Sequence, residues 1–373
     1  MGRLGLVAVA RTLRAPGPGR WAPRAAAPKR TSDALAIHAR DRPSARLPPY
    51  WTGDGTLATL WAGLGFGEQD RPARATRNRS NMRLGVTVPA TGSLPDGGAL
   101  IDVGSAAEVA GADGLWVTDH ALTAVEGTHS HRASSYEERS DPVYDAMACC
   151  AYLAAATLGC RVGTACLVLP QHELIPLAKA AASLDRMSAG RLVLGVGAGW
   201  DPKEMEALGY DFATREARLD EMLQVLRDCW NGRPAPRRGE HVRVPAGVVL
   251  SPVPVAAPAG PPLILVGGGE DVLRRAVDLG DGWLAVADVA ALQPTALAAS
   301  ISLARALHHD SGRSGPFEVV VKLHHAQGQE RQLADAARLV QQAGADEVIV
   351  DIPWEQLDTS TARLNALASA IRG

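Results

Sequence analysis

The feature that most constrains the fold is a repeated alternation of two kinds of segment, from residue 82 to the end of the chain. Short runs of branched apolar residues, of strand length, alternate with amphipathic stretches of helical period. The runs predict strands at Leu84–Val88, Leu115–Val117, Val162–Leu169, Leu192–Val196, Leu263–Val266, Trp283–Val286, Phe317–Leu323 and Glu347–Val350. The stretches predict helices at Ala99–Ala110, Tyr144–Thr157, Glu173–Met187, Arg215–Asn231, Glu270–Leu279, Ala291–Leu307, Glu330–Ala343 and Ser360–Ile371.

This alternation matches a (β/α)8 TIM-type barrel in both the number of units and the length of about 290 residues. An open doubly wound sheet also accommodates eight units, but its usual dinucleotide-binding version carries a GxGxxG turn in the first unit, which this chain lacks. A composition of 46% hydrophobic but only 4% aromatic residues indicates a core of Ala, Val and Leu, as in α/β proteins. The sequence therefore predicts one α/β barrel domain over residues 82–373.

Two segments interrupt the alternation. Residues 119–142 form a long polar loop after the second strand, at the edge where barrels place their active sites. Residues 232–262 contain eight prolines and precede the fifth strand, so connectivity assigns this insertion to the opposite edge unless it folds over the rim. Long loops in compact domains are usually functional lids or disordered segments.

Residues 1–81 differ from the rest in composition. They are rich in Arg, Pro, Gly and Ala, with 14 basic and 5 acidic residues, and show no sustained periodicity. The stretch LGLVAVA resembles a signal-peptide core but no convincing cleavage site follows, and the acid-free opening is also compatible with a transit peptide. We expect a disordered extension, or a start codon placed too early, with Met82 opening the folded protein.

Composition narrows the class of partner. The net charge is −2, and the part after residue 81 is acidic, with 24 basic and 35 acidic residues, which does not suggest a nucleic-acid partner. The five cysteines form no CxxC pair, as expected of reduced thiols, and no apolar stretch is long enough to span a bilayer. We expect a cytoplasmic enzyme with a small-molecule substrate and neither a nucleic-acid nor a membrane partner.

Two glycine turns are candidate phosphate sites. The stretch RLVLGVGAGW places Gly195, Gly197 and Gly199 at and beyond the end of the fourth strand. The stretch LILVGGGED places Gly267–Gly269 between the fifth strand and a helix. Glycines allow backbone N–H groups to approach an anion, and helix N-termini attract phosphate. One such turn would indicate only a tight corner, but two at adjacent strand ends favour a bound phosphate.

Further polar and aromatic residues follow the strand ends. Asp119 and His120 come directly after the second strand, where a histidine can relay a proton or simply cap the strand end. Trp200 and Trp283 are either core residues or walls of an apolar ligand pocket. His129 and His131 have an HxH form used in zinc hydrolases, but they lie in mid-loop without the accompanying ligands at strand ends, so we expect no metal.

These segments together resemble the luciferase-like monooxygenase superfamily, and within it the coenzyme F420-dependent oxidoreductases of actinobacteria. The resemblance covers residues 82–281 and rests on four linked stretches. They are AAEVAGADGLWVTDH, LGCRVGTACLVLPQHELIPLAKAAASLDRMSAGRLVLGVGAGW, ALGYDFATREARLDEMLQVLRDCW and PPLILVGGGEDVLRRAVDLGDGW.

The resemblance implies a barrel that holds its cofactor at the carboxyl ends of the strands, in a homodimer. It implies that the cofactor phosphate is held by backbone groups of Gly197, Ala198, Gly199, Gly267, Gly268 and Gly269. It further implies a non-proline cis peptide at Ala165–Cys166 behind the deazaflavin ring, with Asp119 and His120 beside the reactive centre. Trp200 stands where members that oxidise sugar phosphates carry a glutamate, so we do not expect that reaction.

The function that follows is hydride transfer between coenzyme F420 and an unidentified small organic substrate, with His120 as proton donor or charge stabiliser. We expect the substrate pocket to be formed by the 119–142 loop, Trp200 and Trp283. Three alternatives stay open: an FMN-dependent monooxygenase that uses reduced flavin and O2, a cofactor-binding barrel without turnover, and a metal hydrolase.

Overall fold

The computed structural model describes residues 82–90, 97–122, 143–324 and 330–372. These residues all belong to one compact unit, Pro72–Gly373. The predictions for residues 1–81, and for His129 and His131, concern residues outside those described. Within the described ranges, no helix is both long enough and apolar enough to cross a membrane.

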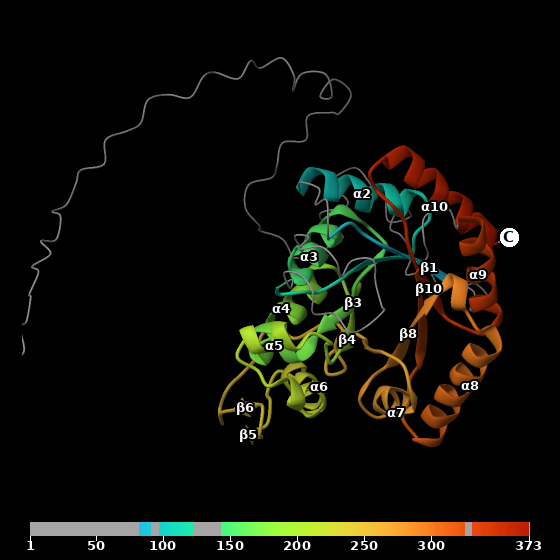
Figure 1. Cartoon of the computed structure of the whole chain (residues 1–373). Coiled ribbons are helices and arrows are strands. Elements are labelled where there is room, and N and C mark those ends of the chain that lie inside the picture. Colours follow the sequence, from blue (N-terminus) through green and yellow to red (C-terminus); the bar gives the residue numbers. More distant parts are fainter. Residues whose placement is uncertain (1–81, 91–96, 123–142, 325–329, 373) are drawn as a thin grey trace, which may run out of the picture. The chain divides into compact units, whose positions relative to one another are not determined.

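Eight parallel strands close into a barrel (Figure 1). Going around it, each strand pairs with the next along the chain, and the last pairs with the first through the register Arg83↔Glu347 to Thr87↔Asp351. The predicted (β/α)8 barrel is therefore confirmed. The barrel strands are β1 Arg83–Thr87, β2 Gly114–Val117, β3 Arg161–Val168, β4 Leu192–Gly197, β7 Leu263–Val266, β8 Gly282–Asp288, β9 Glu318–His324 and β10 Glu347–Asp351.

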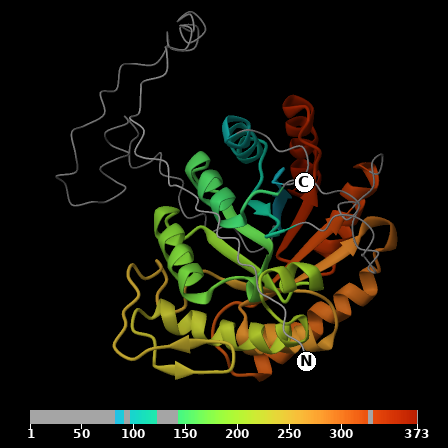
Figure 2. The ribbon, with the colours of Figure 1, turned by 60° about the vertical axis from the view of Figure 1, so that its left-hand side comes forward.

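Helices surround the barrel on the outside, as Figure 2 shows from a second direction. Their apolar faces explain the arrangement: in α4, for example, the buried side chains recur at steps of three and four residues from Leu174 to Leu184. The helices are α2 Gly97–Val109, α3 Ala146–Ala156, α4 Leu174–Met187, α5 Pro202–Ala207, α6 Arg215–Trp230, α7 Glu270–Leu279, α8 Pro294–Asp310, α9 Glu330–Gln342 and α10 Leu357–Arg372. In the described ranges, the 3-10 turns Leu169–Gln171, Phe212–Thr214 and Val289–Ala291 follow strands or precede helices.

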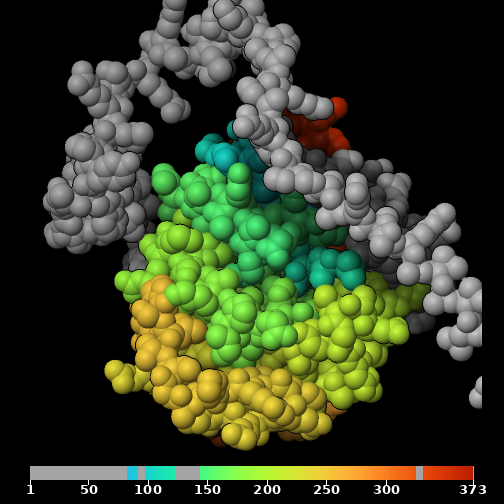
Figure 3. Space-filling model, turned by 90° about the vertical axis from the view of Figure 1, so that its left-hand side faces the viewer, coloured from blue at the N-terminus to red at the C-terminus, as the bar shows by residue number. Residues whose placement is uncertain are grey.

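The Pro-rich insertion lies against the outside of α4 and α6. It contains a short antiparallel hairpin of β5 Arg237–Arg238 and β6 Arg243–Val244. The buried carboxylate of Asp185, near the end of α4, accepts a hydrogen bond from the backbone N–H of Val255. Glu221 of α6 accepts one from the N–H of His241. Figure 3 shows the yellow-to-gold atoms of the insertion spread over the surface of this side of the molecule.

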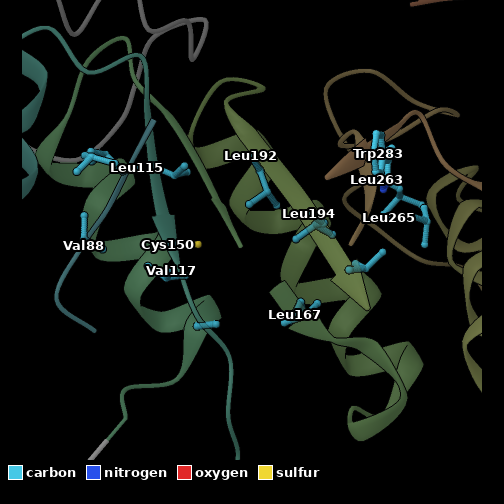
Figure 4. Close-up of a cluster of buried hydrophobic side chains, with 14 of the residues drawn as sticks. Val88, Leu115, Val117, Cys150, Leu167, Leu192, Leu194, Leu263, Leu265 and Trp283 are labelled. Atoms are coloured by element: carbon cyan, nitrogen blue, oxygen red, sulfur yellow. The ribbon is translucent and has the colours of Figure 1, made fainter. Parts of the chain in front are cut away.

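A large apolar layer lies between the barrel and its helices. Figure 4 shows part of it, with Leu192, Leu194, Leu263 and Leu265 projecting from β4 and β7. Because helices cover the outer face of a parallel sheet while the inner face fills the barrel, both faces of each strand are apolar. This explains why the strands appear in the sequence as continuous apolar runs rather than alternating ones.

The barrel interior is filled by a separate cluster centred on Trp116. Its members are Trp116, Ala165, Val193, Ile264, Leu284, Val320 and Ile349. The indole of Trp116 fits because the neighbouring inward positions are glycines. A Cβ on Gly85 would lie 2.5 Å from Nε1 of Trp116, and one on Gly163 would lie 2.8 Å from its Cζ3.

An ionic network closes the interior below Trp116. The indole N–H donates to Oε1 of Glu347 at 2.7 Å, and Glu347 is fully buried. Arg83 and Arg161 both donate to its other oxygen, at 2.9 and 2.7 Å, and both also pair with Glu318. A buried carboxylate with this many charge-assisted donors stays satisfied, so the amino-terminal end of the barrel is sealed by polar groups.

We predict that Trp116→Ala lowers the stability of the protein by about 3–5 kcal/mol, because the glycines around the indole cannot fill the cavity it leaves. Thermal or denaturant unfolding followed by circular dichroism measures this loss. Trp200→Ala is the matched control: Trp200 is 38% exposed, so its loss should cost no more than about 1 kcal/mol. Equal effects of the two substitutions would contradict the assignment of Trp116 to the barrel interior.

Candidate active site

Asp119 connects two neighbouring strand ends at the carboxyl edge of the barrel. The residue lies two positions after the last residue of β2, Val117, and is 4% exposed. Its Oδ2 accepts hydrogen bonds from the backbone N–H of Val168, at 3.0 Å, and from Nε2 of His172, at 2.7 Å. Its own N–H donates to the carbonyl of Cys166 at 3.2 Å. The carboxylate therefore fixes the end of β2 against the end of β3.

His172 belongs to the segment that leads from β3 into α4. Because a carboxylate only accepts, the 2.7 Å contact requires a proton on Nε2 of His172. Burial opposes the charged imidazolium, but the hydrogen bond and the negative charge of Asp119 outweigh it and raise the pKa of His172 above its ordinary value.

His120 is held by a second buried carboxylate, that of Glu204. Nδ1 of His120 lies 3.4 Å from Oε2 of Glu204, which is only 3% exposed. The other oxygen of Glu204 accepts the backbone N–H groups of Ala121, at 2.6 Å, and Leu122, at 3.1 Å. Glu204 thus holds the first residues of the 119–142 loop against α5.

His120 and Glu204 shift each other's pKa in opposite directions. Burial opposes the charge of both. The hydrogen bond and charge of Glu204 nevertheless raise the pKa of His120, and the donors around Glu204 lower the pKa of that carboxyl. The imidazole of His120 therefore holds a proton more readily at neutral pH than a free histidine does, as proton donation requires.

The first glycine turn follows β4 and packs against β3. Gly199 has a positive φ of +85°, and a Cβ there would lie 2.5 Å from Cγ1 of Val168. A Cβ on Gly197 would come within 3.2 Å of Sγ of Cys166. Larger residues would push this turn away from the end of β3, to which Asp119 is hydrogen-bonded, so the glycines permit the close approach.

The second glycine turn follows β7, the strand paired with β4. Gly269 has a φ of +93° and precedes the first residue of α7, while Gly267 accepts a 2.8 Å hydrogen bond from the indole N–H of Trp283. A Cβ on Gly268 would meet nothing within 4 Å. The first turn of α7 carries two acidic side chains, Glu270 and Asp271. Only backbone N–H groups, and no basic side chain of this first turn, are available there to attract an anion.

The structure places the two predicted pocket tryptophans differently. Trp200 is 38% exposed, and its ring lies edge-on to that of His120, with centroids 6.0 Å apart. Trp283 is 5% exposed and packs in the apolar layer outside the barrel, beside Leu263 and Leu265 (Figure 4). Its neighbour Leu284 belongs to the cluster inside the barrel, so Trp283 lies on the opposite face of β8. The prediction that Trp283 walls the pocket is therefore wrong: its indole supports the Gly267 turn from behind.

The third strand has the local geometry that the family resemblance implies. The Ala165–Cys166 peptide bond is cis, and the register of β3 with β4 shifts between Thr164 and Leu167. Burial, with the nearby charge of Asp119, raises the pKa of the Cys166 thiol to about 12. The thiol therefore stays protonated and is not a nucleophile at this site.

Two residues of this arrangement, His172 and Glu204, were not predicted. His172 follows the third strand, so the rule that placed Asp119 and His120 at the rim would also have placed it there. Glu204 lies in α5, which carries no apolar period of its own. The only sequence signal for α5 is Asp201 before Pro202, a helix start in which the Asp201 side chain accepts from the N–H of Lys203.

With this geometry established, comparison with known proteins identifies the family. A family profile described as luciferase-like monooxygenase matches residues 80–369. The match spans well over half of the chain and the whole barrel. The chain belongs to the luciferase-like monooxygenase family.

Two curated relatives illustrate the range of similarity. An uncharacterized protein of Mycobacterium tuberculosis is 28% identical over 283 residues, which cover 73% of this chain and 93% of the relative. An F420-dependent glucose-6-phosphate dehydrogenase of Amycolatopsis mediterranei is 28% identical over 192 residues, covering 50% of this chain and 52% of the relative.

Two solved structures share the fold. An F420-dependent secondary alcohol dehydrogenase in complex with an F420-acetone adduct matches with a TM-score of 0.64 and 15% identity, over 79% of this chain and all of the other. The oxygenating constituent of 3,6-diketocamphane monooxygenase of Pseudomonas putida, in complex with FMN, matches with a TM-score of 0.61 and 13% identity, over 78% and 98% of the two chains. At these identities the likeness concerns the fold alone.

We predict that Glu204→Gln lowers the pKa of His120, because the substitution removes the negative charge while burial of the imidazole remains. A pH titration of the His120 Cε1–H resonance by NMR measures the change. Glu206→Gln is the matched control, since Glu206 is an exposed glutamate of the same helix. An unchanged His120 pKa in Glu204→Gln would contradict the proposed pairing.

Proposed function

We propose that this protein is an oxidoreductase that transfers a hydride between coenzyme F420 and a small organic substrate. The observation that carries the proposal is the pair of glycine turns on the neighbouring strands β4 and β7, at the same barrel edge as Asp119 and His120. F420 is favoured over other cofactors by the resemblance in sequence to F420-dependent oxidoreductases and by the curated relative of that name.

The residues of the two turns fit a phosphate-bearing cofactor. The space beyond Gly268 is open, so an anion can reach the backbone there without meeting a side chain. The N-terminus of α7 has no capping side chain at Gly269, so no N-cap side chain accepts from the first N–H groups of the helix. These N–H groups can therefore donate to a phosphate. Gly197, Ala198 and Gly199 of the first turn, with Gly267, Gly268 and Gly269, would hold the phosphate.

The polar residues of the rim would position the reactants and supply a proton. The bound deazaflavin supplies the hydride chemistry. Ala165 and Cys166, held to Asp119 through the Cys166 carbonyl, would support the back of its ring. His120, with its raised pKa, would donate a proton to the substrate or stabilise developing negative charge. Trp200, whose ring meets that of His120, would form one wall of the substrate pocket.

An FMN-dependent monooxygenase is the second candidate function. It is favoured by the shared fold of the FMN-bound camphane monooxygenase constituent. The same glycine turns would hold the FMN phosphate. The two candidate functions therefore differ in the ring of the cofactor and in the need for O2, but not in the residues that would hold the phosphate.

The test is a pair of binding titrations of the full-length protein, one with oxidised coenzyme F420 and one with FMN, followed by tryptophan fluorescence. We predict saturable binding of F420 and much weaker binding of FMN. Preferential binding of FMN would contradict the F420 proposal and support the FMN-dependent monooxygenase. If the protein binds neither cofactor, both candidate functions are contradicted.

Substitutions in the glycine turns test the phosphate cradle itself. We predict that Gly268→Val weakens F420 binding by more than about tenfold without changing stability, because the new side chain enters the open space reserved for the anion. Gly159→Val, at an exposed glycine before β3 on the opposite edge, is the matched control and should bind normally. Normal F420 binding by Gly268→Val would contradict the assignment of the Gly267–Gly269 turn to the cofactor phosphate.

A further inference from the structure

Lys322 lies inside the mouth of the barrel. It belongs to β9, two residues after Val320, which is part of the interior cluster. Side chains two apart on a strand point to the same face, so Lys322 also points inward, one layer closer to the carboxyl edge. The residue is 7% exposed, which is unusual for a lysine, and no pattern in the sequence points to it.

Its ammonium group has hydrogen-bonding capacity to spare. The closest carboxylate oxygen is Oδ1 of Asp351, at 3.9 Å, which is beyond hydrogen-bond range. The other oxygen of Asp351 is engaged by Nδ1 of His324 at 2.8 Å. Within the described residues, no group accepts a hydrogen bond from Lys322, and Oδ1 of Asp351 is buried without a hydrogen-bond donor. The charges are balanced, but the donors of the ammonium are unused.

The surroundings of Lys322 combine an apolar wall with the candidate cofactor site. Val286 is directly paired with it on β8 and is 51% exposed although it follows the inward-facing Leu284 by two residues. Val286 therefore presents accessible apolar surface beside Lys322. On the other side, the positive charge of Lys322 partly offsets the burial that raises the pKa of the Cys166 thiol. The ammonium thus lies within electrostatic range of the Ala165–Cys166 bulge.

The charge of the cluster indicates what it can bind. The unused donors of the ammonium call for an oxygen acceptor, and a carboxylate forms the charge-assisted hydrogen bond that a neutral carbonyl cannot. Asp351 repels a doubly charged phosphate more strongly than a singly charged carboxylate, so the smaller charge is favoured. Burial strengthens the interaction, since a charge-assisted hydrogen bond gains in a medium of low dielectric.

We infer that Lys322 anchors the substrate through a carboxylate group, and that the substrate is a small organic acid whose apolar part lies against Val286. Asp351 and His324 position the ammonium. The inference rests on the proposed function, because it names the class of substrate that the barrel mouth presents to the cofactor.

The test uses benzoate as the carboxylate probe and benzamide as its uncharged match, titrated into the full-length protein by calorimetry. We expect benzoate to bind and benzamide to bind at least about tenfold more weakly. Lys322→Met, which keeps the length and apolar stem of the side chain, should lose the preference for benzoate. Lys179→Met is the matched control, because Lys179 lies on the outside of α4 and bonds the carbonyl of Ser251.

Two further readings make the outcome decisive. Circular dichroism and F420 titration of Lys322→Met should show an intact fold and unchanged cofactor binding. If the single variant is unstable, the double variant Lys322→Met with Asp351→Asn restores the charge balance and replaces it in the test. Equal binding of benzoate and benzamide by the parent protein, or benzoate binding that survives Lys322→Met, would overturn the inference while leaving F420 binding untouched. If the parent protein binds benzoate through Lys322 but does not bind F420, only the proposed function is refuted.

Discussion

The structure depends on how the barrel interior is filled. Its amino-terminal part is occupied by the indole of Trp116 and the carboxylate of Glu347, which fit because the strands around them carry glycines at the inward positions. Its carboxyl-terminal part carries small residues on β3 and β4, Ala165 and Gly197, beside Val286 and Lys322 on β8 and β9. The same eight strands therefore close one end of the barrel with packed side chains and leave the other end open to ligands, as parallel barrels require of an active-site face.

At the carboxyl end of the barrel, two buried carboxylates hold the segments that follow the strands in fixed positions. Asp119 and Glu204 are each nearly inaccessible to solvent. Asp119 accepts one backbone N–H and Glu204 accepts two, and each also contacts a histidine. A buried carboxylate that lost these donors would be left unsatisfied at a cost of about 1–3 kcal/mol or more, so the positions of His120 and His172 are strongly specified. The raised pKa values of both histidines follow from the same contacts. Positioning and proton affinity thus have one physical origin.

Much of this was predictable from the sequence, and the exceptions have a common cause. The strands, their order and the two glycine turns follow from local patterns: apolar runs of strand length, and glycines at their ends. The inward or outward direction of a side chain does not, because both faces of a buried parallel strand are apolar. Trp283 was for this reason assigned to the pocket although its neighbour Leu284 faces inward, and Lys322 was overlooked. Glu204 was missed because its partners are 82–84 residues away in the sequence.

A crystal structure of the full-length protein with coenzyme F420 bound tests the proposed cofactor site most directly. We predict that the cofactor phosphate lies against the backbone of Gly197–Gly199 and Gly267–Gly269, with the ring over the Ala165–Cys166 bulge and beside His120. A cofactor bound elsewhere on the barrel, or with its phosphate held by side chains remote from both glycine turns, would contradict it.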